Sequence, residues 1–481
     1  MEDIEDLFKF EGTEESTQKR LAKHQVKMSK KRQKQPAKEA PAPAVEEKVK
    51  PRVMEDVVPG NAKIYVKTYG CSHNISDSEY MAGLLQDYGF TMVDSVEEAD
   101  GCLINSCTVK NPSQEKFINL VGSAQQDGKA VVVSGCVPQG DRNLKGLESV
   151  SILGVTQIDR VVEIMEETLK GNTVRLLAKK ELPVLDLPKI RKNKLVEIIP
   201  LSTGCLGSCT YCKTRHARGK LGSYDPDAIV ERARAAVEEG VMEIWLTSED
   251  TGAYGRDIGT NLPNLLKSIV KILPDHAMLR LGMTNPPYIL EHLRAMADIM
   301  KHPRVYEFLH VPVQSGSNDV LDKMNREYTV EEFNEVCDFL KEEMPTMTLA
   351  TDIICGFPTE AAEHHQETCA LVRRHQFPVL NISQFYPRPG TVAARMKQIN
   401  TQDKKQRSGD ITNIFNSYST NGHYVGTEQL VWIMGFDDRV KRKAKTEVGG
   451  KEVDEPLPQL QGHTKSYTKV VLEQRTEILG D

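Results

Sequence analysis

Long hydrophobic runs are missing from this 481-residue chain, although 39% of its residues are hydrophobic. No apolar run approaches the ~18 residues that a membrane-spanning helix needs. The N-terminus, MEDIEDLFKF, is acidic and lacks the apolar core of a signal peptide. The sequence therefore predicts a protein that is neither secreted nor inserted into a membrane.

A strong excess of charge of one sign is also missing. The 62 Lys and Arg residues against 68 Asp and Glu residues give a net charge of −6. Any surface that binds nucleic acid therefore has to be local. The 27% of charged residues is ordinary for a globular protein, and a prior of ~150 residues per domain suggests about three domains.

Cysteine is scarce, because ten residues in 481 are too few for a disulfide scaffold. In a chain without a secretion signal, clustered thiols more often bind metal or act in redox chemistry. Four cysteines lie within apolar or helical patterns and are interpreted as small hydrophobic residues: Cys102, Cys337, Cys355 and Cys369. The other six have spacings that favour chemistry.

The composition and hydrophobic pattern of the sequence change several times along the chain. Residues 1–60 carry a basic run between acidic and proline-containing stretches, which predicts a disordered charged tail. Residues 61–173 alternate apolar runs with amphipathic stretches and predict a parallel sheet covered by helices. Residues 174–194 are rich in Lys and Pro and predict a basic linker.

The remainder predicts two further units, within an overall α/β fold class. Residues 195–421 contain six strand–helix repeats, too few for a full eight-stranded barrel. We therefore predict a curved, partly open (βα)6 barrel. Residues 422–481 show short strands and turns, which predict a small β domain.

The densest chemical signal is the C-x3-C-x2-C cluster of Cys205, Cys209 and Cys212, directly after the first barrel strand. Three thiolates on one loop can converge on one inorganic centre, and Gly204 and Gly207 let the backbone wrap closely. Three ligands leave one iron of a [4Fe-4S] cluster open to a substrate or cofactor. The alternative is a Cys3His zinc site completed by His216. The position at the end of a barrel strand, where barrel active sites lie, favours the cluster.

A second set comprises Cys71, Cys107 and Cys136, each of which directly follows a predicted strand. In a parallel sheet all three emerge at the same carboxyl edge, which is the usual ligand-binding edge. Two interpretations stay open here: a three-thiolate site, or core cysteines at strand ends.

These cysteines stand in motifs that resemble the radical S-adenosylmethionine (SAM) methylthiotransferase family. The similarity runs from about residue 62 to 475 and is carried by TYGCSHNISDSE (68–79), INSCTVK (104–110), SGCVPQ (134–139), HVPVQSGSNDVLDKMNREYT (310–329), TDIICGFPTE (351–360) and FYPRPGTVAARM (385–396). CTYCKTRHARG (209–219) and SEDTGAYGRDIG (248–259) are similar to its eukaryotic and archaeal branch. The stretch GFPTEAAE departs from the family pattern in what we interpret as a loop change.

The resemblance implies an N-terminal methylthiotransferase domain, a central radical-SAM domain and a C-terminal RNA-binding TRAM domain. It implies one [4Fe-4S] cluster on Cys71, Cys107 and Cys136, and a second on Cys205, Cys209 and Cys212, which binds SAM. The implied activity is methylthiolation of threonylcarbamoyl-adenosine beside the anticodon, in tRNA decoding ANN codons, with an unidentified electron donor. Two alternatives are a methylthiotransferase acting on a ribosomal-protein aspartate and a non-catalytic zinc RNA-binding protein.

Further cofactor contacts are expected at the ends of the barrel strands. Ser248, Glu249 and Asp250 follow the second strand, where they could bind the SAM ammonium group or cap the next helix. Gln314 and Ser315 follow the fourth strand with the same two interpretations. Tyr211 stands between two ligands and could support the adenine or simply pack as an aromatic. No side chain is assigned a catalytic role beyond the cluster ligands.

Contacts with RNA are expected in the C-terminal domain, where a basic stretch comprises Lys441, Arg442, Lys443 and Lys445. His463, Lys465 and Lys469 lie close in sequence. Such a patch would bind phosphates without reading sequence, and a solvated loop is the alternative. Many animal relatives add a C-terminal hydrophobic anchor that is missing here, so we expect a cytoplasmic protein, with association to the endoplasmic reticulum as the alternative.

Overall fold

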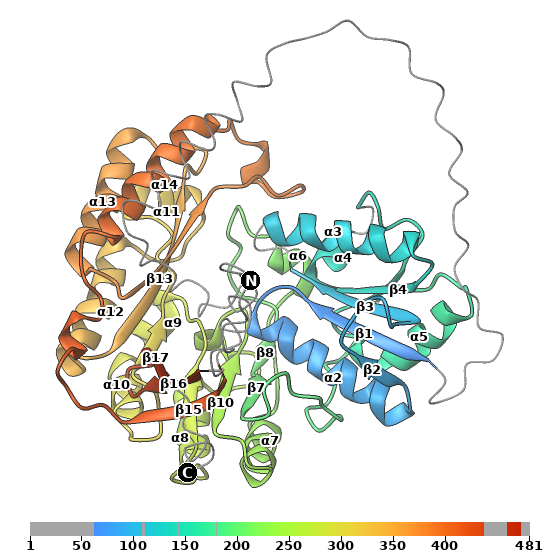
Figure 1. Ribbon diagram of the computed structural model, residues 1–481. Helices are drawn as coiled ribbons and strands as arrows, with labels where there is room; N and C mark the ends of the chain where they lie inside the picture. The colour runs from blue at the N-terminus through green and yellow to red at the C-terminus, as the bar shows by residue number, and fades with distance from the viewer. Residues whose placement is uncertain (1–61, 108–110, 142–143, 179, 437–458, 473–481) are drawn as a thin grey trace, which may run out of the picture.

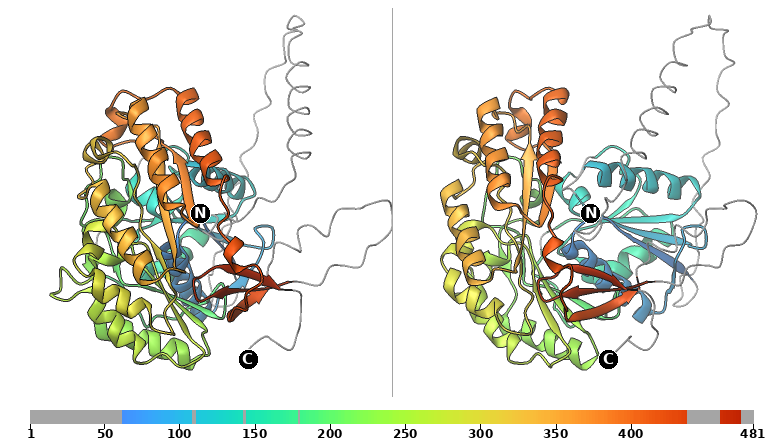
Figure 2. Two further views of the ribbon diagram at one scale, coloured as in Figure 1. Left: turned by 90° about the vertical axis from the view of Figure 1, so that its left-hand side faces the viewer. Right: turned by 60° about the vertical axis from the view of Figure 1, so that its left-hand side comes forward.

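The computed structural model describes residues 62–107, 111–141, 144–178, 180–436 and 459–472. An N-terminal parallel-sheet domain lies beside a curved barrel, and a small antiparallel sheet lies at the barrel's open side (Figures 1 and 2). This arrangement confirms the predicted α/β fold class with a partial six-stranded barrel. Within the described ranges, no helix is long and apolar enough to cross a membrane.

The N-terminal domain contains one six-stranded parallel sheet in the order β2-β1-β3-β4-β5-β6. Its central strands β3 and β4 are buried along their whole length. Burial of both faces explains why their sequences are apolar runs without polar alternation. The strands are β1 (Lys63–Thr68), β2 (Thr91–Val93), β3 (Gly101–Ser106), β4 (Ala130–Gly135), β5 (Ser151–Leu153) and β6 (Arg175–Leu176).

Helices cover both faces of this sheet. One apolar cluster joins Leu103 and Val132 of the sheet to helices α2 (Ser72–Tyr88) and α5 (Val161–Leu169). A second cluster on the opposite face joins Val133 to α3 (Asn111–Gln126). The short α4 (Cys136–Gly140) continues directly from β4, and a 3-10 turn η2 (Ile158–Arg160) precedes α5.

The barrel consists of two three-stranded parallel sheets, β11-β10-β7 and β12-β13-β14, joined by a backbone bridge between Leu279 and Val305. Its six strands follow the predicted repeats: β7 (Val196–Pro200), β10 (Glu243–Thr247), β11 (Met278–Leu281), β12 (Phe308–His310), β13 (Thr348–Cys355) and β14 (Val379–Gln384). A two-stranded ribbon of β8 (Ser202–Thr203) and β9 (Gly222–Ser223) extends the first strand.

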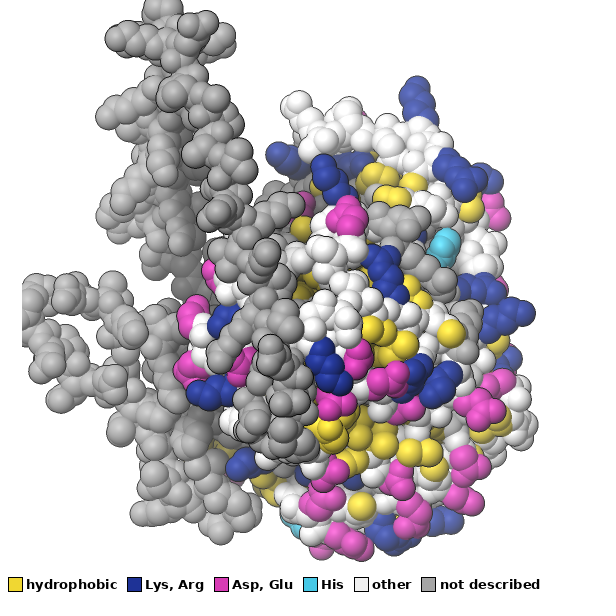
Figure 3. Space-filling view, turned by 90° about the vertical axis from the view of Figure 1, so that its right-hand side faces the viewer, with side chains coloured by type: hydrophobic (Ala, Val, Ile, Leu, Met, Phe, Trp, Pro, Cys, Tyr) yellow, Lys and Arg dark blue, Asp and Glu magenta, His cyan; other side chains and the backbone are white. Residues whose placement is uncertain are grey.

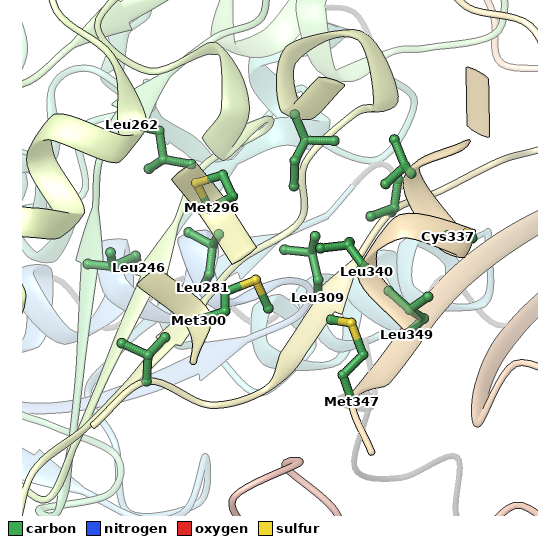
Figure 4. Close-up of a cluster of buried hydrophobic side chains, with 14 of the residues drawn as sticks. Leu246, Leu262, Leu281, Met296, Met300, Leu309, Cys337, Leu340, Met347 and Leu349 are labelled. Atoms are coloured by element: carbon green, nitrogen blue, oxygen red, sulfur yellow. The ribbon is translucent and has the colours of Figure 1, made fainter. Parts of the chain in front are cut away.

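Helices pack on the outer face of these strands around the largest apolar core (Figure 4). Leu340 of helix α12 (Val330–Glu343) is fully buried there, so its replacement by Ala should lower the free energy of unfolding by about 2–5 kcal/mol. The barrel helices are α6 (Thr214–Arg218), α7 (Pro226–Glu238), α8 (Leu262–Val270), α9 (Pro286–Leu290), α10 (Leu293–Met300), α11 (Asn318–Lys323), α12 (Val330–Glu343), α13 (Ala362–His375) and α14 (Thr401–Phe415), with 3-10 turns η3 (Thr251–Ala253), η4 (Ala393–Arg395) and η5 (Gly422–Tyr424).

The segment between the two domains is held by buried charges. Lys189 Nζ lies 2.9 Å from Glu197 Oε1 of β7 and 3.2 Å from Glu79 Oε2 of α2. Arg232 of α7 also binds the fully buried Glu197, at 3.0 Å. The segment predicted as a linker therefore contains β6 and a fixed ionic anchor between the N-terminal domain and the barrel.

Three antiparallel strands, β15 (Val431–Phe436), β16 (Leu460–Thr464) and β17 (Lys469–Leu472), form the C-terminal sheet. The turn after β16 brings Tyr467 against Tyr306 and Phe308 on the inner side of the barrel. The guanidinium of Arg280 lies 4.7 Å from the ring centre of Trp245 and 4.9 Å from that of Tyr467. These contacts fix the small sheet to the barrel; its similarity to a TRAM domain stays a prediction.

Candidate functional site

The first cysteine set lies at the carboxyl edge of the N-terminal sheet. Cys71 follows β1 and precedes α2, Cys107 directly follows β3, and Cys136 is the first residue of α4 after β4. Because β1, β3 and β4 are neighbouring parallel strands, their ends meet at one edge. Cys107 and Cys136 are buried, while Cys71 is partly exposed.

Local backbone geometry packs the loops that carry these cysteines closely together. Gly70 has φ +123°, and a Cβ there would lie 2.6 Å from Cβ and 3.1 Å from Sγ of Cys107. Asn74 of α2 fixes the loops, because its Nδ2 donates to the carbonyl oxygens of Tyr69 and Ser106 at 3.0 and 2.9 Å. Its Oδ1 lies 3.8 Å from Cys136 Sγ.

Two thiols of this set, those of Cys107 and Cys136, are buried, and the cation Arg218 acts on the set. Burial raises the pKa of Cys136 to about 12, while the positive charge of Arg218 acts in the opposite direction. Burial and the neighbouring Cys107 raise the pKa of Cys71 to about 11, again opposed by Arg218. Deprotonated sulfurs here therefore need positive charge, which a bound metal cluster supplies.

The second set occupies the loop after β8. Gly204 has φ +78°, and a Cβ there would lie 2.1 Å from the carbonyl oxygen of Lys220, so the close crossing at this point requires glycine. The Cys205 N–H donates to the Gly219 carbonyl at 3.3 Å. Arg215 donates to the Gly207 carbonyl at 2.8 Å, which holds the loop from within α6.

A chain of polar contacts connects this loop to the barrel strand ends. Arg326 donates to Cys209 Sγ at 3.0 Å and also to Asn285 Oδ1. Asn285 Nδ2 donates in turn to Asp250 Oδ2 at 2.6 Å. Burial raises the pKa of Asp250 to about 6, with the Asn285 hydrogen bonds opposing the shift. A small cavity of about 20 Å³ beside these groups is lined by Cys205, Cys209, Asn285, Tyr288 and Arg326.

Elements that carry the two cysteine sets meet at the domain junction, where Figure 1 shows α6 beside α4. Helix α4, which begins with Cys136, packs against α6, which closely follows Cys212. A Cβ on Gly140 at the end of α4 would lie 3.7 Å from Ala217 of α6, so the helices approach closely. The carboxyl edges of both parallel sheets therefore open toward one shared region.

Three of the predicted cofactor contacts follow β10. Asp250 caps η3 by accepting from the Gly252 N–H at 3.1 Å, and Ser248 Oγ accepts from the Asp250 N–H at 3.0 Å. Glu249 is buried and engaged elsewhere, because its Oε1 lies 3.2 Å from His73 Nδ1 and 3.1 Å from Arg218 Nε. Its Oε1 is thus engaged at the domain junction, and its role as a SAM contact stays a prediction.

The other candidates are largely packed. Gln314 is buried, with φ +69°, a strained conformation for a residue other than glycine that is typical of functional sites. Ser315 Oγ accepts from the Ser317 N–H at 3.3 Å, which is the turn role considered as its alternative. Tyr211 packs edge-on against Phe357 at 6.4 Å. These residues stay predictions as cofactor contacts.

The structure describes only part of the sequence in which the RNA-binding patch is expected. Lys441, Arg442, Lys443 and Lys445 lie outside the described residues. Two neighbours in sequence are engaged within the fold rather than free for phosphate: His463 is buried and binds Glu243, and the partly exposed Lys465 donates to the carbonyl oxygens of His302 (2.7 Å) and Met300 (3.2 Å). On the N-terminal domain face in Figure 3, basic and acidic side chains are interspersed.

The donor chemistry suits iron–sulfur clusters. Each set offers three thiols without a disulfide, and a Cβ on Gly207 would lie within 3.9 Å of both Cys205 Sγ and Cys209 Sγ, so the bare glycine leaves room beside the sulfurs. Among the described residues, no three His, Cys, Asp or Glu side chains, the two cysteine sets included, are gathered as a metal-ion site, so the cluster assignment depends on the thiol chemistry and on the position of the sets. His216 is exposed on α6, and the zinc alternative gains no support from it.

Sequence reasoning missed the side chains that connect the sites. Arg218, Asn74 and Asp77 lie in motifs that carried the resemblance, but nothing in the motifs showed that they meet. His310 and Asp352, 2.9 Å apart, project from the strand face opposite the helices and were also missed. Polar residues alternating with core residues along β12 and β13 were the available signal.

Two family models match the chain: the uncharacterized protein family UPF0004 over residues 63–153 and the Radical SAM superfamily over residues 199–372. The human threonylcarbamoyladenosine tRNA methylthiotransferase is 56% identical over 394 residues, covering 80% of this chain and 68% of the relative. The Drosophila pseudoobscura enzyme of that name is 50% identical over 489 residues, covering 100% of this chain and 84% of the relative. The chain belongs to the threonylcarbamoyladenosine tRNA methylthiotransferase family.

Solved structures support the fold assignment of this family member. The radical SAM methyltransferase TsrM from Kitasatospora setae, with tryptophan and a SAM analogue bound, aligns with a TM-score of 0.52 at 13% identity. The alignment covers 69% of this chain and 75% of that one. At such low identity the likeness concerns the fold alone. The Radical SAM match implies an iron–sulfur cluster and SAM as cofactors.

Proposed function

We propose that this protein converts N6-threonylcarbamoyladenosine beside the anticodon of tRNA to its 2-methylthio derivative. Family membership and the two cysteine sets that face one junction support this proposal. We further propose that the substrates are tRNAs decoding ANN codons and that the chain carries two [4Fe-4S] clusters. The observation that carries the proposal is that α4, with Cys136, packs on α6, next to the Cys205–Cys212 loop.

Each site has residues fitted to hold its group. Cys71, Cys107 and Cys136 would hold the N-terminal cluster, and Cys205, Cys209 and Cys212 the barrel cluster with SAM on its open iron. When bound, these groups supply radical cleavage of SAM and the sulfur to be transferred. Arg326 donates to Cys209 Sγ and orders Asn285 and Asp250 at the rim of the cavity.

The test is nucleoside mass spectrometry of tRNA carrying threonylcarbamoyladenosine, incubated anaerobically with reconstituted protein, SAM, sulfide and dithionite. The expected product is the 2-methylthio nucleoside, absent when the tRNA has plain adenosine at that position. A variant of a core cysteine, Cys337→Ala, serves as a matched control that retains activity. Failure to modify the tRNA, together with modification of an aspartate in a ribosomal protein, would move the protein to the other substrate class.

A further inference from the structure

One arginine occupies the junction between the two cysteine sites. Arg218 is the last residue of α6, and its side chain is 2% exposed. Its Nη2 donates to Asn74 Oδ1 at 2.8 Å and to Asp77 Oδ2 at 2.6 Å, both on α2. Its Nε lies 3.1 Å from Glu249 Oε1, beyond the end of β10. A residue of the barrel thus binds the N-terminal domain and the barrel simultaneously.

The same guanidinium lies beside the sulfurs of the N-terminal set. Asn74 Oδ1, which accepts from Arg218 Nη2 at 2.8 Å, lies 3.8 Å from Cys136 Sγ. The positive charge of Arg218 acts on the sulfurs of both Cys136 and Cys71. Other titratable and charged groups at this junction are His73, Asp77, Glu249 and, near Cys107, Arg388.

We infer that Arg218 is a positioning residue that fixes the N-terminal cysteine site against the barrel and sets the reduction potential of the cluster proposed there. The inference rests on the proposed function, because it assumes that Cys71, Cys107 and Cys136 hold a cluster. One-electron reduction by a low-potential donor adds a negative charge to this buried pocket. A fixed cation and hydrogen bonds to the ligand sulfurs favour the reduced state and raise the potential.

The position of Arg218 in the chain makes it a mechanical link as well. The carbonyl of Gly219 accepts from the Cys205 N–H at 3.3 Å, and the Gly219 N–H donates to the Arg215 carbonyl at 2.9 Å. Arg218 is thus adjacent in sequence to a residue that anchors the loop of the second cysteine set. Together with the Lys189 anchor and the packing of α4 on α6, Arg218 helps to set the distance between the two sites.

The experiment is a potentiometric titration, followed by electron paramagnetic resonance, of anaerobically reconstituted full-length protein. Replacing Cys205, Cys209 and Cys212 by Ala in the background isolates the signal of the N-terminal cluster. Arg218→Gln should shift the reduction potential to lower values. Arg218→Lys keeps the charge and should therefore return the potential most of the way to the wild-type value. In the unaltered background, Arg218→Gln should reduce tRNA methylthiolation at least tenfold while SAM cleavage without tRNA persists.

Arg232→Gln is the matched control, since Arg232 also binds a buried carboxylate, Glu197, but lies in the other ionic anchor. It should lower stability and leave the potential of the N-terminal cluster unchanged. An Arg218→Gln protein with full iron content and the wild-type potential would overturn the inference. The Arg218→Gln protein could also fail to bind the N-terminal cluster at all. In that case, a cluster bound by both Arg218→Lys and Arg232→Gln supports the inference, and equal loss of the cluster from all three variants overturns it. Failure of the proposed function can be told apart from failure of this inference, because in the former case the wild-type protein itself would not methylthiolate tRNA.

Discussion

Nδ1 of His463 on β16 lies 2.9 Å from Oε1 of Glu243, the first residue of β10. Both side chains are buried, and the hydroxyl of Tyr306 donates to the same oxygen. This contact joins the C-terminal sheet to the barrel across 220 positions of sequence. The orientation of the C-terminal sheet therefore depends on a buried polar pair surrounded by aromatic rings.

The first prediction concerns this docking contact. His463→Ala leaves the buried Glu243 with fewer partners and should destabilise the protein by about 3 kcal/mol. Urea unfolding followed by circular dichroism measures the loss, and limited proteolysis should release the C-terminal sheet first. Val471→Ala, at a side chain exposed on β17, is the control and should change stability by less than about 0.5 kcal/mol. Equal stability of the two variants would show that the pair does not hold the sheet.

The two cysteine sets should be separable, which is the second prediction. Reconstituted wild-type protein should bind about eight irons, and each triple Cys→Ala variant about four. Loss of Cys205, Cys209 and Cys212 should abolish reductive SAM cleavage. Loss of Cys71, Cys107 and Cys136 should leave uncoupled SAM cleavage and remove methylthiolation.

Iron and sulfide analysis and the release of 5′-deoxyadenosine provide the measurements for this test. Cys102→Ala changes another buried cysteine of the N-terminal domain and should keep both clusters. Equal loss of SAM cleavage in both triple variants, with both folded, would contradict the assignment.

A third prediction tests the backbone crossing at Gly204. The φ of +78° and the 2.1 Å approach of a Cβ to the Lys220 carbonyl mean that Gly204→Ala has to open the loop of Cys205. It should lose about half of the bound iron, specifically that of the barrel site, and SAM cleavage with it. Gly240→Ala is matched, because Gly240 has φ +87° but nothing within 4 Å of its Cβ position. Gly240→Ala should lower the free energy of unfolding by only about 1–2 kcal/mol and should keep the bound iron.

The cysteine geometry was predictable because it follows from short-range rules. Cys71, Cys107 and Cys136 each follow an apolar run, and parallel strands end at one edge. The six barrel strands were found for the same reason, since strand–helix alternation has a clear period. Gly204 was recognisable as a point of close backbone approach, because a glycine next to a ligand cysteine has no Cβ to block that approach.

The connections between domains were not predictable in this way. Arg218 and Asn74 are 144 positions apart, and no periodicity in either motif indicates that contact. Lys465 illustrates the converse error, because a lysine near other basic residues suggests an exposed patch. Its ammonium group instead binds backbone carbonyls between α10 and β12. Only the docking of one unit on another decides such cases.

The RNA-binding role of Lys441, Arg442, Lys443 and Lys445 is the fourth prediction and concerns residues outside the described ranges. Phosphate contacts release counterions, so replacing the four by Ala should weaken tRNA binding and reduce its dependence on salt. The log–log slope should fall by about 0.7–0.9 per lost contact. SAM cleavage without RNA should be unchanged. Filter binding over a range of salt measures both effects, and unaltered affinity and slope would remove these residues from the interface.

A fifth prediction concerns the pH dependence of stability. Burial, with the nearby charges of Lys341 and Arg374, lowers the pKa of His375 to about 4. Its Nε2 lies 2.7 Å from Asn334 Oδ1, and only 4% of the residue is exposed. In the unfolded chain this imidazole takes up a proton below about pH 6.5, whereas the folded protein resists protonation until about pH 4. The unfolded state thus binds more protons in this window, and stability is lost as the pH falls through it.

His375→Gln should flatten this dependence, because it removes the group whose protonation differs between the two states. The difference in unfolding free energy between pH 7 and pH 4.5 should shrink by about 2 kcal/mol, after allowance for solvent screening of the shift. Urea unfolding at several pH values provides the measurement. His276→Gln changes an exposed histidine and should follow the wild-type curve. Identical pH curves for His375→Gln and wild type would mean that His375 is protonated equally in the folded and unfolded states.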